Sequence, residues 1–397
     1  MFIHLSLVLG SLTTIAVAAV SQANVRPPVI IVPGFGGSRA YIRSKERTGE
    51  PFKQLWLDLK NIIDPSVLTK LFELTHLNNN HQSQENEKFE IIFPGWGDTR
   101  NLEYLDDSKH VLGRQFNTFV TSLVNTSFYR RNLSIRGAPY DFRKTPHENK
   151  MFMINLKKLI EQTYALNEMT RVALISHSMG TLYCAYFLHL QTQSWKKTYL
   201  QTFIAISGPF GGAARTTKAI ASGDNFGVSH YPPLSVRRML RSFSSLALLL
   251  PDERLWFSNE TLIYTPNFNY SVHDMKRFFE DIKFARGYHM MRSAKDSFDY
   301  LKGPTGVDNV YCIHGAGIPT IERVVYKPHT LLSLPFPDQS PELVYGEGDG
   351  TVNLRSLSQC ANWTGVHYTQ IPKAHHTHIL KDPRLLKLMK KILRIST

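Results

Sequence analysis

The sequence predicts an α/β protein in which a mostly parallel sheet carries helices on both faces. Short β-branched runs alternate along the chain with stretches that repeat apolar residues at helical spacing, and this alternation is typical of such sheets. Of the 397 residues 42% are hydrophobic, which is enough for the large core that the fold requires.

Six short apolar runs are predicted as strands, and three amphipathic stretches between them are predicted as helices. The strands cover residues 27–34, 88–95, 172–178, 202–209, 308–315 and 342–350, and the helices cover 111–125, 150–167 and 179–192. Because helical stretches separate several of the strands, we expect most of the sheet to be parallel.

Two segments break this alternation and read as insertions. Residues 42–86 show no run suited to a sheet strand, and residues 213–305 are basic and rich in aromatic side chains. Insertions above an α/β sheet commonly form lids or caps, so apolar residues such as Trp56 and Leu57 could meet a substrate. Alternatively, these residues pack inward as a local core.

The first 23 residues, "MFIHLSLVLGSLTTIAVAAVSQA", predict a secretory signal peptide. An uncharged apolar stretch is followed by small residues that fit a cleavage site, which leaves residues 24–397 as one domain with two insertions. A membrane anchor is the competing interpretation, but the apolar run is short for the roughly 20 residues that a span needs.

Cysteine usage and glycosylation motifs agree with the secretory route. Cys312 and Cys360 have polar neighbours and suit a disulfide, whereas Cys184 lies in an apolar run and suits a buried free thiol. Five acceptor motifs for N-glycosylation occur, at Asn125, Asn132, Asn259, Asn269 and Asn362.

The formal charge of +14 predicts attraction to an anionic partner. A secretory protein seldom meets nucleic acid, and no nucleic-acid-binding motif is present, so an anionic lipid surface or an acidic compartment fits better. A solubilising surface charge without any partner is the alternative. We expect a monomer.

The stretch "SHSMG", residues 176–180, has the form of a nucleophile elbow. An apolar strand precedes it and a helical run follows it, as in α/β hydrolases, where small residues flank a nucleophile on a strained turn. Ser176 replaces the usual first glycine but is also small. We therefore predict Ser178 as the nucleophile, with a chance match in a buried turn as the alternative.

A serine nucleophile needs a base that a carboxylate orients, and in this fold the order along the chain is serine, acid, histidine. Asp349 follows an apolar run within a glycine-rich turn and is the predicted acid, with Glu347 as the alternative. The stretch "AHHTH" then supplies three histidines, His375, His376 and His378, and order alone does not choose among them. A metal site is a rival interpretation, but no acidic or cysteine ligands cluster nearby.

The glycine-rich stretch "PGFGGS", residues 33–38, follows the first predicted strand. Its glycines allow a tight turn beside the nucleophile, where the main-chain amides of Phe35 and Met179 would stabilise an oxyanion. A phosphate-binding loop is disfavoured because no Gly-Lys-Ser/Thr sequence follows.

Several longer stretches resemble the lecithin:cholesterol acyltransferase family, and within it the lysosomal phospholipase A2 branch. They include "PPVIIVPGFGG", "FPGWGDTRNLEYLDDSK", "RGAPYDFRKTPHEN", "GPFGGAARTTKAIASGDN", "VYCIHGAGIPT" and "GEGDGTVNLRSLSQC", and they run in family order. The resemblance implies an α/β hydrolase with a membrane-binding lid and a cap. It implies a calcium-independent serine acyl hydrolase and O-acyltransferase without a cofactor, secreted or lysosomal, that cleaves glycerophospholipids through an acyl-enzyme. A sterol acyltransferase and a catalytically silent lipid-binding protein are the alternatives.

The family's catalytic pattern matches this chain residue by residue. It implies Ser178 as nucleophile, Asp349 as acid and the amides of Phe35 and Met179 as oxyanion donors. A histidine followed four residues later by an apolar residue fits His376, with His378 as the alternative.

The chain also departs from the family in two places. Residues 40–80 lack the cysteines that usually close the lid, which predicts a looser lid or altered access for substrate, although Trp56 matches the lid tryptophan. Phe35 stands where the phospholipase branch carries an acidic residue, which puts inherited acid-pH behaviour in doubt. The second family disulfide is matched by Cys312 and Cys360.

Overall fold

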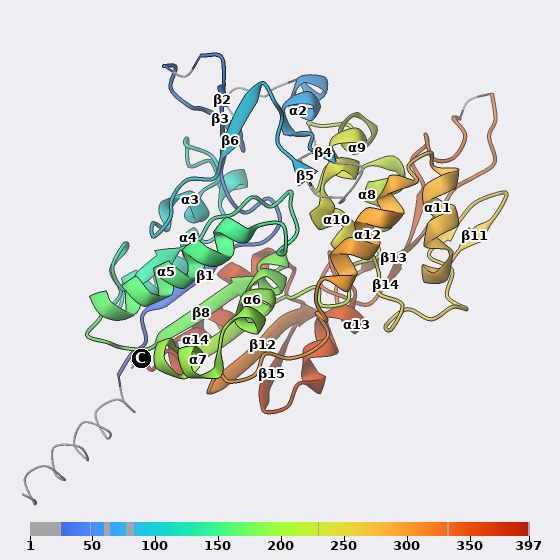
Figure 1. Ribbon diagram of the computed structural model, residues 1–397. Coiled ribbons are helices and arrows are strands. Elements are labelled where there is room, and N and C mark those ends of the chain that lie inside the picture. The colour runs from blue at the N-terminus through green and yellow to red at the C-terminus, as the bar shows by residue number, and fades with distance from the viewer. Residues whose placement is uncertain are drawn as a thin grey trace, which may run out of the picture.

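The computed structural model describes residues 25–47, 49–58, 64–76, 83–228, 230–331 and 333–395 (Figure 1). The predicted signal peptide, residues 1–23, lies outside the described residues. Among the helices of the described residues, none has the length and hydropathy that a membrane crossing requires.

Six parallel strands form the central sheet, in the order β15-β12-β9-β8-β1-β7. They are β1 (Val29–Val32), β7 (Ile135–Gly137), β8 (Val172–His177), β9 (Leu200–Ile206), β12 (Asn309–Ala316) and β15 (Val366–Pro372). Strands β1, β8 and β9 are buried along their whole length, which explains why they read as continuous apolar runs.

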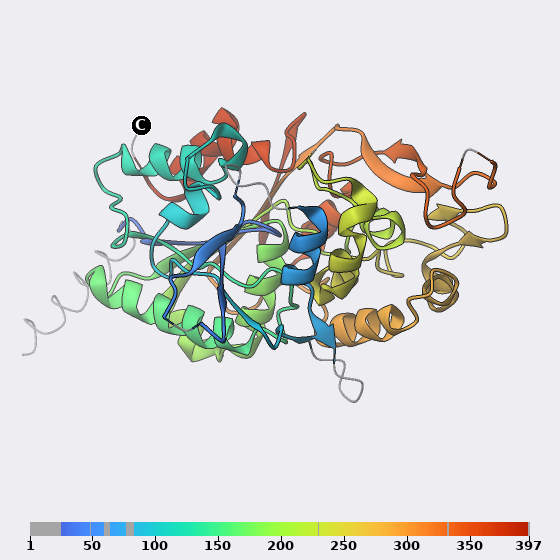
Figure 2. The same cartoon turned by 90° about the horizontal axis from the view of Figure 1, so that it is seen from above.

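Helices cover both faces of this sheet, as the two views in Figures 1 and 2 show. One face carries α5 (Lys150–Leu166), α6 (Met179–Leu190) and α7 (Gln193–Tyr199), and the other carries α4 (Asn117–Val124) and α14 (Pro383–Ile392). Layers of this kind and this strand order are those of an α/β hydrolase, so the predicted fold class is confirmed.

Two predicted strands lie outside the central sheet, contrary to expectation. Strand β6 (Phe89–Ile92) pairs antiparallel with β2 (Ala40–Ser44), and β14 (Glu342–Gly346) pairs antiparallel with β13 (Thr320–Val325). Both runs are partly exposed rather than sandwiched between helices, and an apolar run by itself does not specify its pairing partner.

The sequence analysis also missed two strands of the central sheet. Strand β7 is only three residues long, and β15 lies at the edge with most of its side chains exposed or half-buried. Neither offers the continuous apolar run that marks the interior strands.

The lid segment, residues 42–86, does contain strands, which corrects the prediction that it has none. Its β3 (Lys53–Trp56) joins β2 and β6 in a separate antiparallel sheet, and β4 (Thr75–His76) pairs with β5 (Ser83–Gln84). Asp64 is the N-cap of helix α2 (Pro65–Phe72), and its carboxylate accepts a hydrogen bond from the N–H of Ser66.

The cap segment, residues 213–305, contains helices and two short strands. It holds α8 (Arg215–Ser222), α9 (Pro233–Ser242), α10 (Ser244–Leu248), α11 (Met275–Asp281), α12 (Arg286–Asp296), β10 (Ile263–Tyr264) and β11 (Asn269–Tyr270). Strands β11 and β10 extend the β13–β14 pair into a second sheet of four strands. Short helices α3 (Arg100–Glu103) and α13 (Leu354–Leu357) complete the α-helices of the described residues, and four 3-10 helices are also present: η1 (Val111–Gly113), η2 (Val272–Asp274), η3 (Ser358–Asn362) and η4 (His378–Lys381).

Candidate active site

Ser178 lies on the sharp turn between β8 and α6. Its backbone adopts φ 53° and ψ −131°, a strained conformation that the surrounding main chain must hold in place. The N–H of Ser178 donates to the carbonyl of Ile206 at 2.8 Å, and a Cβ atom at Gly180 would lie 2.2 Å from the carbonyl oxygen of Pro33. The start of α6 is therefore pressed against the end of β1, and only glycine fits at position 180.

Three side chains that are far apart in sequence form one hydrogen-bonded chain at the carboxyl edge of the sheet. His376 Nε2 lies 2.8 Å from Ser178 Oγ, and His376 Nδ1 lies 2.7 Å from Asp349 Oδ2. Asp349 is fully buried and His376 is 5% exposed. Donation of the Nδ1 proton to the carboxylate leaves Nε2 free to accept the serine proton.

Main-chain donors hold the carboxylate of Asp349. Its Oδ1 accepts the N–H of Thr351 at 3.1 Å and of Val352 at 2.9 Å, while its carbonyl accepts the N–H of His376 at 2.8 Å. Of the two candidate acids, Asp349 contacts the histidine, whereas Glu347 contributes its main-chain carbonyl to the N–H of Leu354.

His177 was part of the predicted elbow, but sequence reasoning assigned it no role. Its Nε2 donates to the carbonyl of His376 at 2.9 Å, and the two rings lie 5.1 Å apart. Burial, together with the neighbouring His376, lowers the pKa of His177 to about 3. The ring is therefore neutral and supports the main chain at His376.

The glycine-rich turn after β1 lies directly against the nucleophile. A Cβ atom at Gly34 would lie 2.7 Å from Ser178 Cβ, so the backbone reaching Phe35 approaches the serine as closely as glycine permits. The N–H of Met179 is the first of the 12-residue helix α6, where main-chain donors point away from the helix. This arrangement suits the two predicted oxyanion donors.

Trp56 of the lid segment contacts this same turn. Its Nε1 donates to the carbonyl of Gly36 at 2.8 Å, and its ring is half-buried against Phe72 and Phe142. Leu57 is only 7% exposed and therefore packs inward, instead of facing an open substrate path.

The Phe35 side chain belongs to an aromatic cluster at the glycine-rich turn. Its ring centroid lies 5.3 Å from those of Phe142 and Phe226 and 6.3 Å from that of Phe243. Phe142 and Phe243 are buried in the core, and Phe35 and Phe226 are half-buried against it.

The two remaining histidines of the "AHHTH" stretch stand outside the hydrogen-bonded chain. The rings of His375 and His378 lie 5.8 Å apart on the surface. Within the described ranges, no group of three or more histidine, cysteine, aspartate or glutamate side chains is placed to hold a metal ion.

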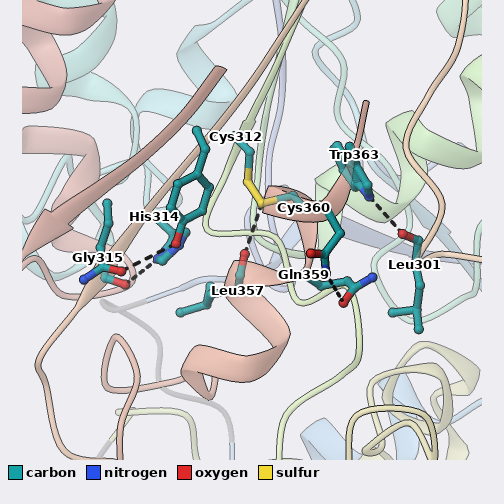
Figure 3. The surroundings of a disulfide bond; sticks show 11 residues. Leu301, Cys312, His314, Gly315, Leu357, Gln359, Cys360 and Trp363 are labelled. Carbon is teal, nitrogen blue, oxygen red and sulfur yellow. Dashed lines mark hydrogen bonds between the residues drawn. A yellow bond between two sulfur atoms is a disulfide. The ribbon is translucent and has the colours of Figure 1, made fainter. Parts of the chain in front are cut away.

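Cys312 and Cys360 form a disulfide that joins β12 to the turn before β15 (Figure 3). The Cα atoms are 6.3 Å apart, and next to the bridge the Trp363 Nε1 donates to the carbonyl of Leu301 at 2.9 Å. Cys184 is a buried free thiol whose pKa is raised by burial. The five glycosylation-motif asparagines, Asn125, Asn132, Asn259, Asn269 and Asn362, are all exposed.

Comparisons with known proteins identify relatives along nearly the whole chain. The sequence model of the lecithin:cholesterol acyltransferase family matches residues 52–302 and 301–383. Proteins named lysosomal phospholipase A and acyltransferase from Canis lupus familiaris and Homo sapiens are 36% and 34% identical over 390 residues. The alignments cover 94% of this chain and 92% and 91% of those proteins, respectively.

A second kind of relative is similar at nearly the same level. The phosphatidylcholine-sterol acyltransferase of Mus musculus is 34% identical over 389 residues, covering 94% of this chain and 86% of that protein. Among solved structures, a chain in the crystal structure of the Tle4-Tli4 complex superposes with a TM-score of 0.50 at 12% identity. That superposition covers 94% of this chain and 99% of the other, and it bears on the fold alone.

Proposed function

The chain belongs to the lecithin:cholesterol acyltransferase family, and we propose that it is a calcium-independent serine acyl hydrolase and O-acyltransferase acting on glycerophospholipids. The observation that carries the proposal is the buried chain of hydrogen bonds from Ser178 through His376 to Asp349. The names of the relatives supply the substrate class, because a serine triad alone is compatible with many esters.

The first half-reaction forms an acyl-enzyme. Ser178 Oγ attacks the acyl carbonyl while His376 Nε2 takes the serine proton, and Asp349 stabilises the imidazolium that results. The amides of Phe35 and Met179 stabilise the oxyanion. Collapse of the tetrahedral intermediate breaks the ester bond, and His376 returns the proton to the departing lysophospholipid oxygen.

The second half-reaction uses the same groups in the reverse direction. His376 removes a proton from water or from the hydroxyl of a lipid alcohol, whose oxygen attacks the acyl-enzyme carbonyl. Ser178 recovers its proton as the new acid or ester leaves. The aromatic cluster around Phe35 would hold the acyl chain during both steps, since Phe35 follows Gly34 in the turn that packs against Ser178.

We further propose that the enzyme works as a monomer on membrane surfaces of the secretory pathway, either in lysosomes or outside the cell. The charge of +14 supports attraction to anionic bilayers, and basic side chains on the lid and cap segments would contribute. Binding to anionic and to neutral vesicles at low salt tests this attraction, and equal binding would contradict it.

The test of activity measures fatty acid released from phosphatidylcholine vesicles that contain an anionic lipid, with and without ceramide, at acidic and neutral pH. We expect release of fatty acid and formation of acylated ceramide, both reduced at least about 10³-fold in Ser178→Ala. Ser176→Ala is the matched control, because it keeps its Cβ and loses a 3.3 Å bond to the carbonyl of Ile204 and a hydrogen bond with the Cys184 thiol. Equal release by wild type and Ser178→Ala would refute the assignment.

A sterol acyltransferase is the second candidate, and the similarity to the murine phosphatidylcholine-sterol acyltransferase favours it. Replacing ceramide by cholesterol in the same vesicles separates the two, since preferential formation of cholesteryl ester would identify the second activity. A lipid-binding protein without catalysis would fail to react with a fluorophosphonate probe, which we expect to label wild type but not Ser178→Ala.

A further inference from the structure

In the described part of the loop between β13 and β14, residues 326–331 and 333–341, two leucine side chains face solvent. Leu331 is fully exposed and Leu334 is 57% exposed. Single exposed leucines are ordinary on a protein surface, whereas two near one loop tip bring exposed apolar surface together.

The stem of this loop is well anchored. Phe336 packs edge-on against the buried Tyr326 with ring centroids 4.7 Å apart, and it stacks at 6.2 Å on Tyr270. The side-chain amide of Gln339 donates across the loop to the carbonyls of Lys327 and Leu334, both at 2.9 Å. The exposure of the leucines is therefore a consequence of a defined loop conformation.

The loop is attached to the cap segment through a basic helix. Arg237 of α9 pairs with Asp338 at 2.7 Å and donates to the carbonyl of Pro337 at 3.4 Å. On the same helix Leu234 is 37% exposed, and the side chain of Arg238 is 76% exposed. Apolar and cationic side chains thus continue from the loop onto α9.

Helix α9 in turn packs against α2 of the lid segment. The hydroxyl of Thr69 donates to the carbonyl of Ser235 at 3.0 Å, and Arg238 pairs with Glu73 at 2.9 Å. Val67 on α2 is 44% exposed. In Figure 1 both α2 and the β13–β14 loop, drawn in red-orange at the right, project toward the top of the view.

We propose that the β13–β14 loop inserts Leu331 and Leu334 into a phospholipid bilayer and extends the membrane contact of the lid segment across α9. This proposal rests on the proposed phospholipid substrate. A bilayer is the occupant that fits, because the exposed apolar side chains are spread along a row of three elements, the loop, α9 and α2.

The test compares wild type with Leu331→Ser/Leu334→Ser in sedimentation with vesicles of phosphatidylcholine and phosphatidylserine. We expect the vesicle partition coefficient to fall by between about tenfold and about a hundredfold, since each leucine loses apolar burial in the bilayer. The KM for vesicle substrate rises correspondingly, while hydrolysis of a soluble short-chain ester is unchanged.

The matched control is Leu166→Ser/Leu190→Ser. These leucines are 54% and 49% exposed, and they end α5 and α6 at the amino edge of the sheet, away from Ser178. The proposal would be overturned if the loop variant had the same vesicle partition coefficient as wild type. It would also be overturned if the control variant lost as much partition as the loop variant. If no ester is hydrolysed at all, the proposed function fails, yet the partition coefficients still decide about the loop.

A second measurement is independent of activity. Leu331→Cys labelled with an environment-sensitive dye should show a blue shift on addition of the same vesicles, and labelled Leu166→Cys should not. Cys184 is buried and the other two cysteines are bridged, so labelling is confined to the new thiol. A blue shift that follows protein concentration without vesicles would mean that two copies pair through the loop, which would overturn the proposal.

Discussion

The carboxyl edge of the central sheet and the lid segment are held in place by different kinds of interaction. At the sheet edge, main-chain groups fix both ends of the catalytic chain: the N–H of Ser178 bonds to Ile206, and the carboxylate of Asp349 accepts two main-chain amides. Beyond the main-chain pairing of β2 with β6, the described part of the lid segment is joined to the core largely through side chains. The geometry of Ser178, His376 and Asp349 therefore depends on the fold itself, whereas the attachment of the lid segment depends more on side-chain contacts.

The lid contacts centre on an arginine that is almost completely buried. Arg143 Nη2 lies 2.9 Å from Glu85 and 2.8 Å from Asp141, and Lys144 Nζ lies 2.5 Å from Glu85. The carboxylate of Glu148 accepts the N–H of Ser83 at 2.8 Å. These bonds fasten the carboxyl-terminal end of the lid segment.

Replacing Asp349, the proposed catalytic acid at the sheet edge, should have the largest effect on activity. We expect Asp349→Asn to lower kcat/KM by about 10³- to 10⁴-fold, because an amide no longer fixes the productive tautomer of His376 or stabilises its charge. Activity on a soluble ester measures this without involving the lid. Glu347→Gln should stay within about threefold of wild type. The opposite ranking of the two variants would show that the acid is misassigned.

The second-largest effect is expected from adding one methyl group at position 180 of the elbow, and it falls on the stability of the fold. Gly180→Ala brings a Cβ within 2.2 Å of the Pro33 carbonyl, so strand and helix must separate, and we expect a loss of about 3 kcal/mol in the free energy of unfolding. Chemical denaturation measures the loss. In the lid segment Gly49→Ala meets no atom within 4 Å and should be nearly neutral. Equal stability of both variants would mean that the elbow tolerates movement.

The same contrast explains which features the sequence predicts. The family and the fold class are confirmed, since the elbow and the buried strands are local patterns of a few consecutive residues. Strands β6 and β14 were placed in the wrong sheet, because pairing depends on distant neighbours. The sequence favoured Asp349 over Glu347 as the acid, but its spacing left three histidines within four residues as candidates for the base. The contact between Asp349 and His376 depends on a turn whose shape no short motif specifies.

Lowering the pH should reduce the free energy of unfolding, because the unfolded chain takes up a proton at His177. Its pKa is about 3 when folded and about 6.5 when unfolded, so the unfolded chain binds the extra proton between these values. The contribution to stability is complete above about pH 6.5 and decreases as the pH falls, by about 2 kcal/mol between pH 7 and pH 5. Denaturation of His177→Gln at both pH values should show a correspondingly smaller loss than wild type. An exposed histidine, as in His230→Gln, should not alter the slope, and identical slopes for all three proteins would exclude His177 as the source.

Loosening the lid should have the smallest effect on stability and the most local one. Glu85→Gln removes the carboxylate that faces both Arg143 and Lys144, but Arg143 keeps Asp141, so we expect a cost of only about 1 kcal/mol. Because this cost falls on the attachment of the lid, proteolytic cleavage within residues 42–86 should become about fivefold faster, while turnover of a soluble ester is unchanged. Glu50→Gln is the matched control, since it loses only an exposed pair with Arg47 in the same segment. If the two variants are cleaved at the same rate, the buried arginine does not fasten the lid segment. The contrast between main-chain bonds at the triad and side-chain bonds at the lid segment would then no longer hold.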